Sequence, residues 1–275
     1  MLKDYLESVK KINPLIHNIT NYVTVNDCAN ILLACGASPI MADDINEVEE
    51  ITSICNGLNI NIGTLNTRVI ESMYKAGVQS NKLGHIVVLD PVGVGASSLR
   101  TSTANRLIKD IKFTVIRGNI SEIKNLALEN DTSITKGVDA NILDTVTEEN
   151  INEAVNLAKK FSEKTGAVIA ITGAIDIIAD SQKAYCIFNG NPMMSKVTGT
   201  GCQLSALITA YVSANPENPL EATVSAVCTM GVCGEKAYKL MDNNSGNSSY
   251  RNYIIDSVYN LTGEELDKMA KYKVY

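Results

Sequence analysis

The sequence predicts an α/β protein, with a mostly parallel central sheet flanked by helices on both faces. Short apolar runs alternate with amphipathic stretches along the first two thirds of the chain, and three runs are apolar throughout, which is typical of strands covered on both faces. The 275 residues contain no linker of disordered composition and no internal repeat. We therefore expect one domain spanning residues 1–275.

The first third of the chain predicts three strands, each followed by a helix. The strands are expected at 15–20, 38–42 and 58–63, and the helices at 25–35, 45–55 and 67–77. The first helix ends at Gly36, because a glycine directly after the last periodic residue is typical of a helix C-terminus.

The rest of the chain continues this pattern and then becomes helical. Buried strands are expected at 85–91, 113–119 and 167–173, with a long helix at 147–166 and a β-hairpin of 176–180 and 184–189 at the sheet edge. Helices are expected at 201–213, 219–241, 248–261 and 263–272. Ligands of such sheets bind in the loops that follow the carboxyl ends of the strands.

Composition excludes several classes of function. The net charge of −6 argues against a surface for duplex nucleic acid, which would need an excess of lysine and arginine. There is no apolar run of membrane-spanning length and no apolar core of a signal peptide, so we expect a cytoplasmic protein with no membrane partner. The seven cysteines include no C-x-x-C pair, which argues against a zinc ribbon or a redox pair.

Two predicted strand ends carry charged residues suited to phosphate chemistry. Asp90 ends the strand before PVGVGAS, where its carboxylate can hold Mg²⁺ or can simply cap the following turn. Arg117 leaves the next strand and can clamp phosphate oxygens. Glu122 can join the magnesium site, or can form a helix-capping arrangement with Asn119 three residues earlier.

A third strand ends in AITGAID, where the hydroxyl of Thr172 and nearby amides could meet a nucleotide phosphate. The fourth candidate is VTGTGCQLSALITAY, in which the apolar periodicity places a helix start near Gly201 or Cys202. Free amides and the helix dipole make such a start an anion site. The dipole would also lower the pKa of the Cys202 thiol; the alternative is that Cys202 is a small hydrophobic residue at the helix start.

Together these junctions favour phosphoryl transfer. The loop carboxylates, the arginine and the anion-binding helix start supply positioning and charge neutralisation, which do most of the work in that reaction. Zinc chemistry lacks ligands. Of the two histidines, His85 begins a strand rather than ending one, which argues against a catalytic histidine triad.

Six stretches between His17 and Ile208 resemble the hydroxyethylthiazole kinases of the ribokinase-like superfamily. They are HNITNYVTVNDCANILLACGASPIMAD, NIGTLN, LDPVGVGAS, VIRGNISEI, ITGAID and VTGTGCQLSALI. The glycine motif is common to the superfamily, whereas HNITN and SPIMA make the resemblance specific. It implies a ribokinase-like fold and ATP-dependent phosphorylation of the alcohol of 4-methyl-5-(2-hydroxyethyl)thiazole in thiamine salvage.

The same resemblance implies roles for particular residues. Arg117 and Thr172 are implied to contact ATP, and Met41 and Gly199 to line the thiazole site. Asp90 and Glu122 are implied to bind magnesium, and Cys202 is implied to be the catalytic residue. Asn21 and Gly63 are implied as neighbours of the substrate. Most ribokinase-like kinases have aspartate at the position of Cys202, so the general-base contribution of the thiol stays open.

The resemblance also implies a cytoplasmic homotrimer with active sites between subunits. Two alternatives are a hydroxymethylpyrimidine kinase, which shares the GTGC pattern, and an ATP-binding regulator without catalysis. HNITN and SPIMA argue against the first alternative. The retained Asp90, Arg117, Glu122 and Cys202 argue against the second.

Overall fold

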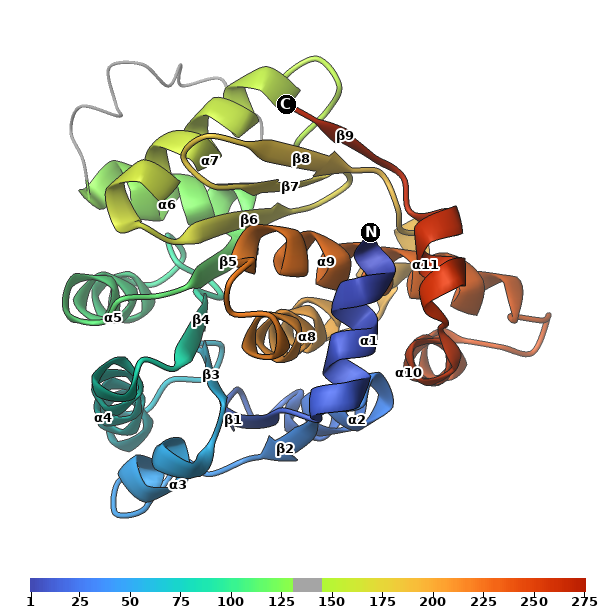
Figure 1. The fold of residues 1–275 in the computed structure, drawn as a ribbon. Coiled ribbons are helices and arrows are strands. Elements are labelled where there is room, and N and C mark those ends of the chain that lie inside the picture. Colours follow the sequence, from blue (N-terminus) through green and yellow to red (C-terminus); the bar gives the residue numbers. More distant parts are fainter. Residues whose placement is uncertain (131–144) are drawn as a thin grey trace.

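The structure, a computed structural model, describes residues 1–130 and 145–275. Within them the strands form one nine-stranded sheet in the order β2-β1-β3-β4-β5-β6-β7-β8-β9 (Figure 1). Neighbouring strands from β2 to β6 are parallel, and those from β6 to β9 are antiparallel. The predicted α/β architecture with a mostly parallel sheet is confirmed.

The parallel part of the sheet is built from strand–helix repeats, and the last part of the chain is mainly helical. In chain order the elements are α1 Leu2–Ile12, β1 Leu15–Ile19, α2 Val25–Cys35, β2 Ser38–Ile40, α3 Val48–Ile54, β3 Gly57–Asn61, α4 Thr67–Leu83, β4 Ile86–Asp90, α5 Ser98–Asp110, β5 Val115–Asn119, α6 Ile120–Asn130, α7 Ile151–Thr165, β6 Val168–Thr172, β7 Asp176–Ala179, β8 Ala184–Ile187, the 3₁₀-helix η2 Pro192–Lys196, α8 Thr200–Ala214, α9 Pro219–Lys239, α10 Asn247–Asn260, α11 Gly263–Met269 and β9 Tyr272–Val274.

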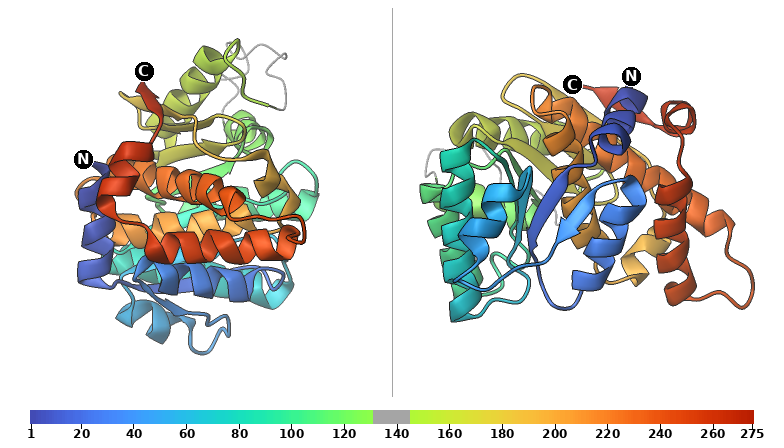
Figure 2. Two further views of the ribbon diagram at one scale, coloured as in Figure 1. Left: turned by 90° about the vertical axis from the view of Figure 1, so that its right-hand side faces the viewer. Right: turned by 60° about the horizontal axis from the view of Figure 1, so that its bottom comes forward.

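Helices cover both faces of the sheet (Figure 2). One apolar core joins the sheet to α1, α2, α8, α9, α10 and α11, and a second joins it to α4, α5, α6 and α7. Helix α9 lies inside the first core: Val224, Val227, Met230 and Val232 are all buried within the chain. Such continuous burial explains why α9 is apolar around most of its circumference.

Three predicted features differ from the structure. The helix expected at 263–272 ends at Met269, and Tyr272 begins the strand β9 instead. The hairpin β7–β8 is antiparallel as expected, but β9 pairs with β8 and takes the sheet edge in its place. The helix expected at 67–77 continues to Leu83, because Gly77 is an interior helix residue that leaves room for the Ile111 side chain. No helix among the described residues is long and apolar enough to cross a membrane.

Candidate active site

The predicted residues lie together at the carboxyl-terminal ends of the parallel strands. Asn61 and Asp90 are register partners at the ends of β3 and β4, and Asn119 and Thr172 are partners at the ends of β5 and β6. Helix α8 packs against β1, β3 and β4. Its N-terminus therefore lies beside these strand ends, as expected for an open α/β sheet.

The glycine-rich turn before α8 is shaped for close approach. Gly199 is the N-cap with a φ of 85°, and a side chain there would run into Thr24. The amide of Gln203 donates to the carbonyl of Gly199, so the amides of Thr200, Gly201 and Cys202 precede the first hydrogen bond of the helix. Those amides are the donors expected of an anion site.

Cys202 lies in the first turn of α8 and is only 9% exposed. Its Sγ accepts hydrogen bonds from Asn21 Nδ2 at 3.1 Å and Asn61 Nδ2 at 3.3 Å. Burial raises the pKa of the Cys202 thiol above its usual value, and the nearby charge of Asp90 raises it further. The pKa of Cys202 is therefore raised overall and not lowered as expected, because desolvation and the Asp90 carboxylate outweigh the lowering effects of Thr24, Asn21 and Arg117.

Asp90 is fully buried at the end of β4. Its Oδ2 accepts from Asn61 Nδ2 at 2.7 Å and from Ser205 Oγ at 2.8 Å. Burial nevertheless raises the pKa of the Asp90 carboxyl to about 6; Arg117 opposes this rise and the charge of Glu122 adds to it. The site therefore holds a costly buried carboxylate that a cation would stabilise.

Arg117 joins the carboxylate to the next strand end. Its Nη1 lies 3.4 Å from Asp90 Oδ1, and its Nη2 donates to Thr172 Oγ1 at 2.6 Å. A Cβ on Gly201 would lie 2.6 Å from Arg117 Nη1, so glycine is what lets the guanidinium rest against the start of α8. The two residues predicted to contact ATP are thus in direct contact with each other.

Glu122 forms the predicted capping arrangement. Its Oε2 accepts from the Asn119 amide and the Asn119 Oδ1 accepts from the Glu122 amide, both at 2.8 Å. Its other oxygen, Oε1, accepts from the Gly93 amide at 2.8 Å. Glu122 therefore ties the loop after β4 to the start of α6, and this geometry leaves the metal-binding role of its carboxylate as an expectation.

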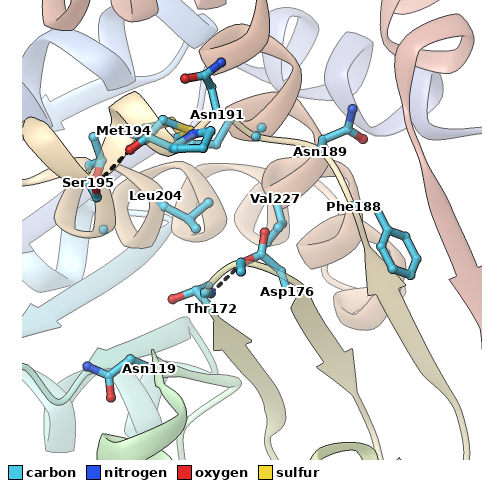
Figure 3. Close-up of a pocket in the computed structure, with 18 of the residues that line it drawn as sticks. Asn119, Thr172, Asp176, Phe188, Asn189, Asn191, Met194, Ser195, Leu204 and Val227 are labelled. Atoms are coloured by element: carbon cyan, nitrogen blue, oxygen red, sulfur yellow. Dashed lines mark hydrogen bonds between the residues drawn. The ribbon is translucent and has the colours of Figure 1, made fainter. Parts of the chain in front are cut away.

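A cavity of about 540 Å³ opens beside Arg117 and Thr172. Figure 3 shows Leu204 and Val227 projecting from α8 and α9 on one side and Thr172 at the end of β6 on the other. The remaining lining is contributed mainly by the segment after β8, by η2 and by α9: Phe188, Asn189, Gly190, Asn191, Pro192, Met194, Ser195, Met230 and Gly231. The cavity is mostly apolar, and Arg117 and Thr172 supply a cation and a hydroxyl at one end. Such a cavity suits a nucleotide, with its flat base in the apolar part and its phosphates at the polar end.

Asp176 is a second carboxylate in this cavity. Its Oδ1 accepts from the Gly173 amide at 2.9 Å, which holds the turn after β6 (Figure 3). Desolvation raises the pKa of the carboxyl to about 7, against the opposing effects of that hydrogen bond and of Arg117. Of the amides near Thr172 that could meet a phosphate, the Gly173 amide is thus occupied by Asp176.

The residues implied for the thiazole side are less closely assembled. Gly199 contacts Thr24, and Asn21 contacts Cys202, so both belong to the cluster. The Gly63 amide donates to Asn61 Oδ1 at 2.9 Å. Met41 instead lies half-buried beyond the edge strand β2, packed against the core on the α8 side of the sheet, and does not line the cavity beside Arg117.

Asn61, Ser205 and Asp176 belong to the site but do not follow from the sequence patterns above. Asn61 ends a strand two residues before Gly63, and Ser205 lies four residues after Gly201 on the same helix face. Only these positions in the sequence could have pointed to Asn61 and Ser205 as site residues. An asparagine at a strand end and a serine in a helix are too common to be singled out without their contacts.

The donor set fits a magnesium ion. Mg²⁺ in kinases is bound by one or two carboxylates together with phosphate oxygens and water. Asp90 and Glu122 are close enough for the charge of Glu122 to raise the pKa of Asp90, and a bound cation would relieve that repulsion. The described residues contain no group of three or more histidine, cysteine or acidic side chains that could hold a metal by themselves.

Comparison with known proteins agrees with this geometry. A model of the hydroxyethylthiazole kinase family matches residues 6–264. A hydroxyethylthiazole kinase of Clostridium acetobutylicum is 68% identical over the full length of both chains. The chain belongs to the hydroxyethylthiazole kinase family. A relative of the same name from Methanobrevibacter smithii is 44% identical, over 96% of this chain and 93% of its own.

Solved structures agree with this family and its fold. A hydroxyethylthiazole kinase protein of Pyrococcus horikoshii superposes with a TM-score of 0.88 at 34% identity, covering all of this chain and 98% of its own. A pyridoxal kinase of Staphylococcus aureus gives a TM-score of 0.60 at 17% identity, over 95% and 97% of the two chains, which shows the shared ribokinase-like fold. As a member of this family, the chain is an enzyme and a kinase.

Proposed function

We propose that this protein transfers the γ-phosphoryl group of ATP to the alcohol of 4-methyl-5-(2-hydroxyethyl)thiazole, giving the thiazole phosphate for thiamine diphosphate biosynthesis. The observation that carries the proposal is the convergence of Cys202, Asp90 and Arg117 at the start of α8 in a chain of this family. We take the whole of residues 1–275 as the single kinase domain that performs the reaction.

The cavity beside Arg117 and Thr172 is proposed as the ATP site. Its apolar slot accommodates the base, and its end at the start of α8 offers amide donors and a guanidinium to the phosphates. Arg117 is held against Gly201, so its charge is placed before the nucleotide arrives. Such preorganised charge is the main catalytic contribution in phosphoryl transfer.

Asp90 and Glu122 are proposed to hold Mg²⁺. The ion, when bound, would neutralise charge on the phosphates. The protein's own contribution is to keep Asp90 fixed through Ser205 and Asn61, and to keep Glu122 fixed through backbone amides.

Cys202 is proposed as the catalytic residue beside the attacking hydroxyl. It orients that hydroxyl and accepts its proton in the thiolate form. The raised pKa of the thiol makes it a sparsely ionised base, which a loose transition state tolerates because proton removal can lag behind bond breaking. Met41 and Gly199 are proposed to line the thiazole site on the other side of Cys202.

The proposed assembly is a cytoplasmic homotrimer with active sites between subunits, an expectation from the family resemblance. Tyr22 is 78% exposed and Val23 is 56% exposed, on the turn between Asn21 and α2. Two large apolar side chains beside the cluster around Cys202 would be covered if a neighbouring subunit completed the thiazole site. Light scattering and activity measured along a dilution series test this: a monomer with full activity would refute it.

A substrate panel tests the reaction. ADP release is measured with the thiazole alcohol, hydroxymethylpyrimidine, pyridoxal and no acceptor, each with and without Mg²⁺. We expect magnesium-dependent turnover with the thiazole alcohol. Turnover with hydroxymethylpyrimidine alone would identify the other vitamin-pathway kinase, and absence of turnover with every acceptor would refute the proposed kinase activity on these alcohols.

A further inference from the structure

One asparagine stands between Cys202 and Asp90. The side-chain amide nitrogen of Asn61 donates to Asp90 Oδ2 at 2.7 Å and to Cys202 Sγ at 3.3 Å. An amide nitrogen has two hydrogens, so both of its donors are used. Asn61 is fully buried at the end of β3, next to β4 in the sheet.

The orientation of the Asn61 amide is fixed by its oxygen. Asn61 Oδ1 accepts from the Gly63 backbone amide at 2.9 Å and from Asn21 Nδ2 at 3.0 Å. A backbone N–H can only donate, so the oxygen must face Gly63 and the nitrogen must face Cys202 and Asp90. The opposite rotation of the amide would place two donors against Gly63 and an oxygen against the Asp90 carboxylate.

Asn21 is fixed in the same way. Its Oδ1 accepts from the Thr24 amide at 3.2 Å and from Thr24 Oγ1 at 3.1 Å, which leaves Asn21 Nδ2 to donate to Asn61 and to Cys202. Cys202 Sγ therefore receives an N–H group from each of the two asparagines.

We propose that Asn61 is a positioning residue that aligns the sulfur of Cys202 with the carboxylate of Asp90. The proposal rests on the function proposed above, in which Cys202 meets the alcohol and Asp90 serves the phosphate side. The side-chain amide of Asn61 then sets the distance between the Cys202 sulfur, which meets the alcohol, and the Asp90 carboxylate, which serves the phosphates. Displacements of about 1 Å in such an arrangement cost on the order of 10²-fold in rate.

The test is a double-mutant cycle between Asn61→Ala and Cys202→Ala. We expect Asn61→Ala to lower kcat by about 10- to 100-fold at saturating substrates and Mg²⁺, with little change in either KM. In the Cys202→Ala background the same change should cost less than about threefold, because the residue it aligns is already gone. An equal loss in both backgrounds would overturn the proposal.

Two neighbouring residues supply matched controls. Asn59→Ala removes a fully buried asparagine of the same strand, two residues earlier, that donates to Asn18 and not to the site; we expect kcat within about twofold of the wild type. Ser205→Ala removes a hydroxyl that donates to Asp90 and to the Gly201 carbonyl but leaves both asparagine donors to Cys202 in place, so its effect should be equal in the two Cys202 backgrounds. A loss in Asn59→Ala as large as in Asn61→Ala would show a general packing effect and would also overturn the proposal.

A second readout needs no catalysis. The rate of Cys202 alkylation by iodoacetamide is followed by peptide mass spectrometry against pH, in protein without nucleotide or metal. Loss of an N–H donor to sulfur disfavours the thiolate, so Asn61→Ala should move the midpoint of this profile to higher pH, whereas altered access would change only the plateau rate. An unmoved midpoint would contradict the contact. Because this assay involves no substrate, it separates a failure of the alignment from a failure of the proposed reaction.

Discussion

The guanidinium of Arg117 lies 3.4 Å from the carboxylate of Asp90, and the arginine is 13% exposed where the aspartate is fully buried. Although Arg117 lowers the pKa of Asp90, burial has the larger effect and the value remains raised. Arg117 therefore does not pair with Asp90 exclusively. Its other nitrogen reaches Thr172, and the same guanidinium faces the cavity.

Gly201→Ala should selectively weaken ATP binding. The added methyl group would lie 2.6 Å from Arg117 Nη1 and would displace the guanidinium. Loss of one charge-assisted contact to phosphate corresponds to roughly a 10- to 100-fold rise in KM for ATP. We expect little change in KM for the thiazole alcohol. Gly173→Ala, in the same cavity, meets only the Ile175 carbonyl at 3.9 Å and is the control; equal effects of the two variants would contradict this reading.

Asp176 should make the ligand-free protein less stable as pH rises. The pKa of Asp176 is raised to about 7 in the folded state from an ordinary value of 3.8. Below pH 3.8 both states are protonated. Between pH 3.8 and 7 the unfolded chain releases this proton before the folded one, so the contribution of Asp176 to the free energy of unfolding falls throughout that window.

Asp176→Asn should remove this dependence while keeping an oxygen for the Gly173 amide. Its stability relative to the wild type should increase from pH 4 to pH 7, by on the order of a few kcal/mol. Urea unfolding at a series of pH values measures the difference, with Asp242→Asn as an exposed control whose pKa is shifted in the opposite direction. A difference independent of pH would refute the raised pKa.

Glu122→Gln should raise the magnesium requirement and lower kcat. The substitution removes a charge proposed to hold the ion, with a typical cost of about 10- to 100-fold. Glutamine also has one acceptor oxygen where glutamate has two, so either the Gly93 amide or the Asn119 amide loses its acceptor, and circular dichroism must confirm that the fold persists. Unchanged kcat and unchanged magnesium dependence would show that Glu122 acts only as a helix cap.

Cys202→Asp should remain active, and Cys202→Ala should lose about 10²- to 10⁴-fold in kcat. A carboxylate can accept the proton and can receive the amide donors of Asn21 and Asn61. Intact mass after ATP addition separates this role from a covalent one, which would leave a phosphothiol on the wild type and an almost inactive Cys202→Asp. An alanine variant with wild-type kcat would exclude both roles.

The sequence predicts the parallel strands and most of the helices, because periodicity and terminal glycines are local signals. Helices α1, α5 and α6 are not predicted. Gly36 and Gly166 end their helices in the left-handed conformation, as the pattern indicates. Strand β9 could not be found in this way. Its three residues are all exposed and carry no alternation of burial, and they form a strand only because β8 offers an unpaired edge.

The same distinction applies to the site. Residues at strand ends, such as Asp90 and Arg117, could be found because the topology of an open α/β sheet predicts where its ligands bind. The role of Asn61 depends on amide hydrogen bonds to two residues distant in sequence, and no local pattern encodes those. The raised pKa of Cys202 is likewise a product of tertiary burial, which overrides the local effect of the helix terminus.

The segment that leads into β9 has a consequence for the shape of the cavity. The Phe188 amide, in the cavity wall, donates to the Lys271 carbonyl at 2.8 Å, and β9 follows directly. The Lys271 amide in turn donates to Asn189 Oδ1, at 2.7 Å. This part of the cavity wall is therefore held in place by a segment that does not itself line the cavity. A change at Lys271 or in β9 can thus alter the space offered to the base without touching any residue at the phosphate end.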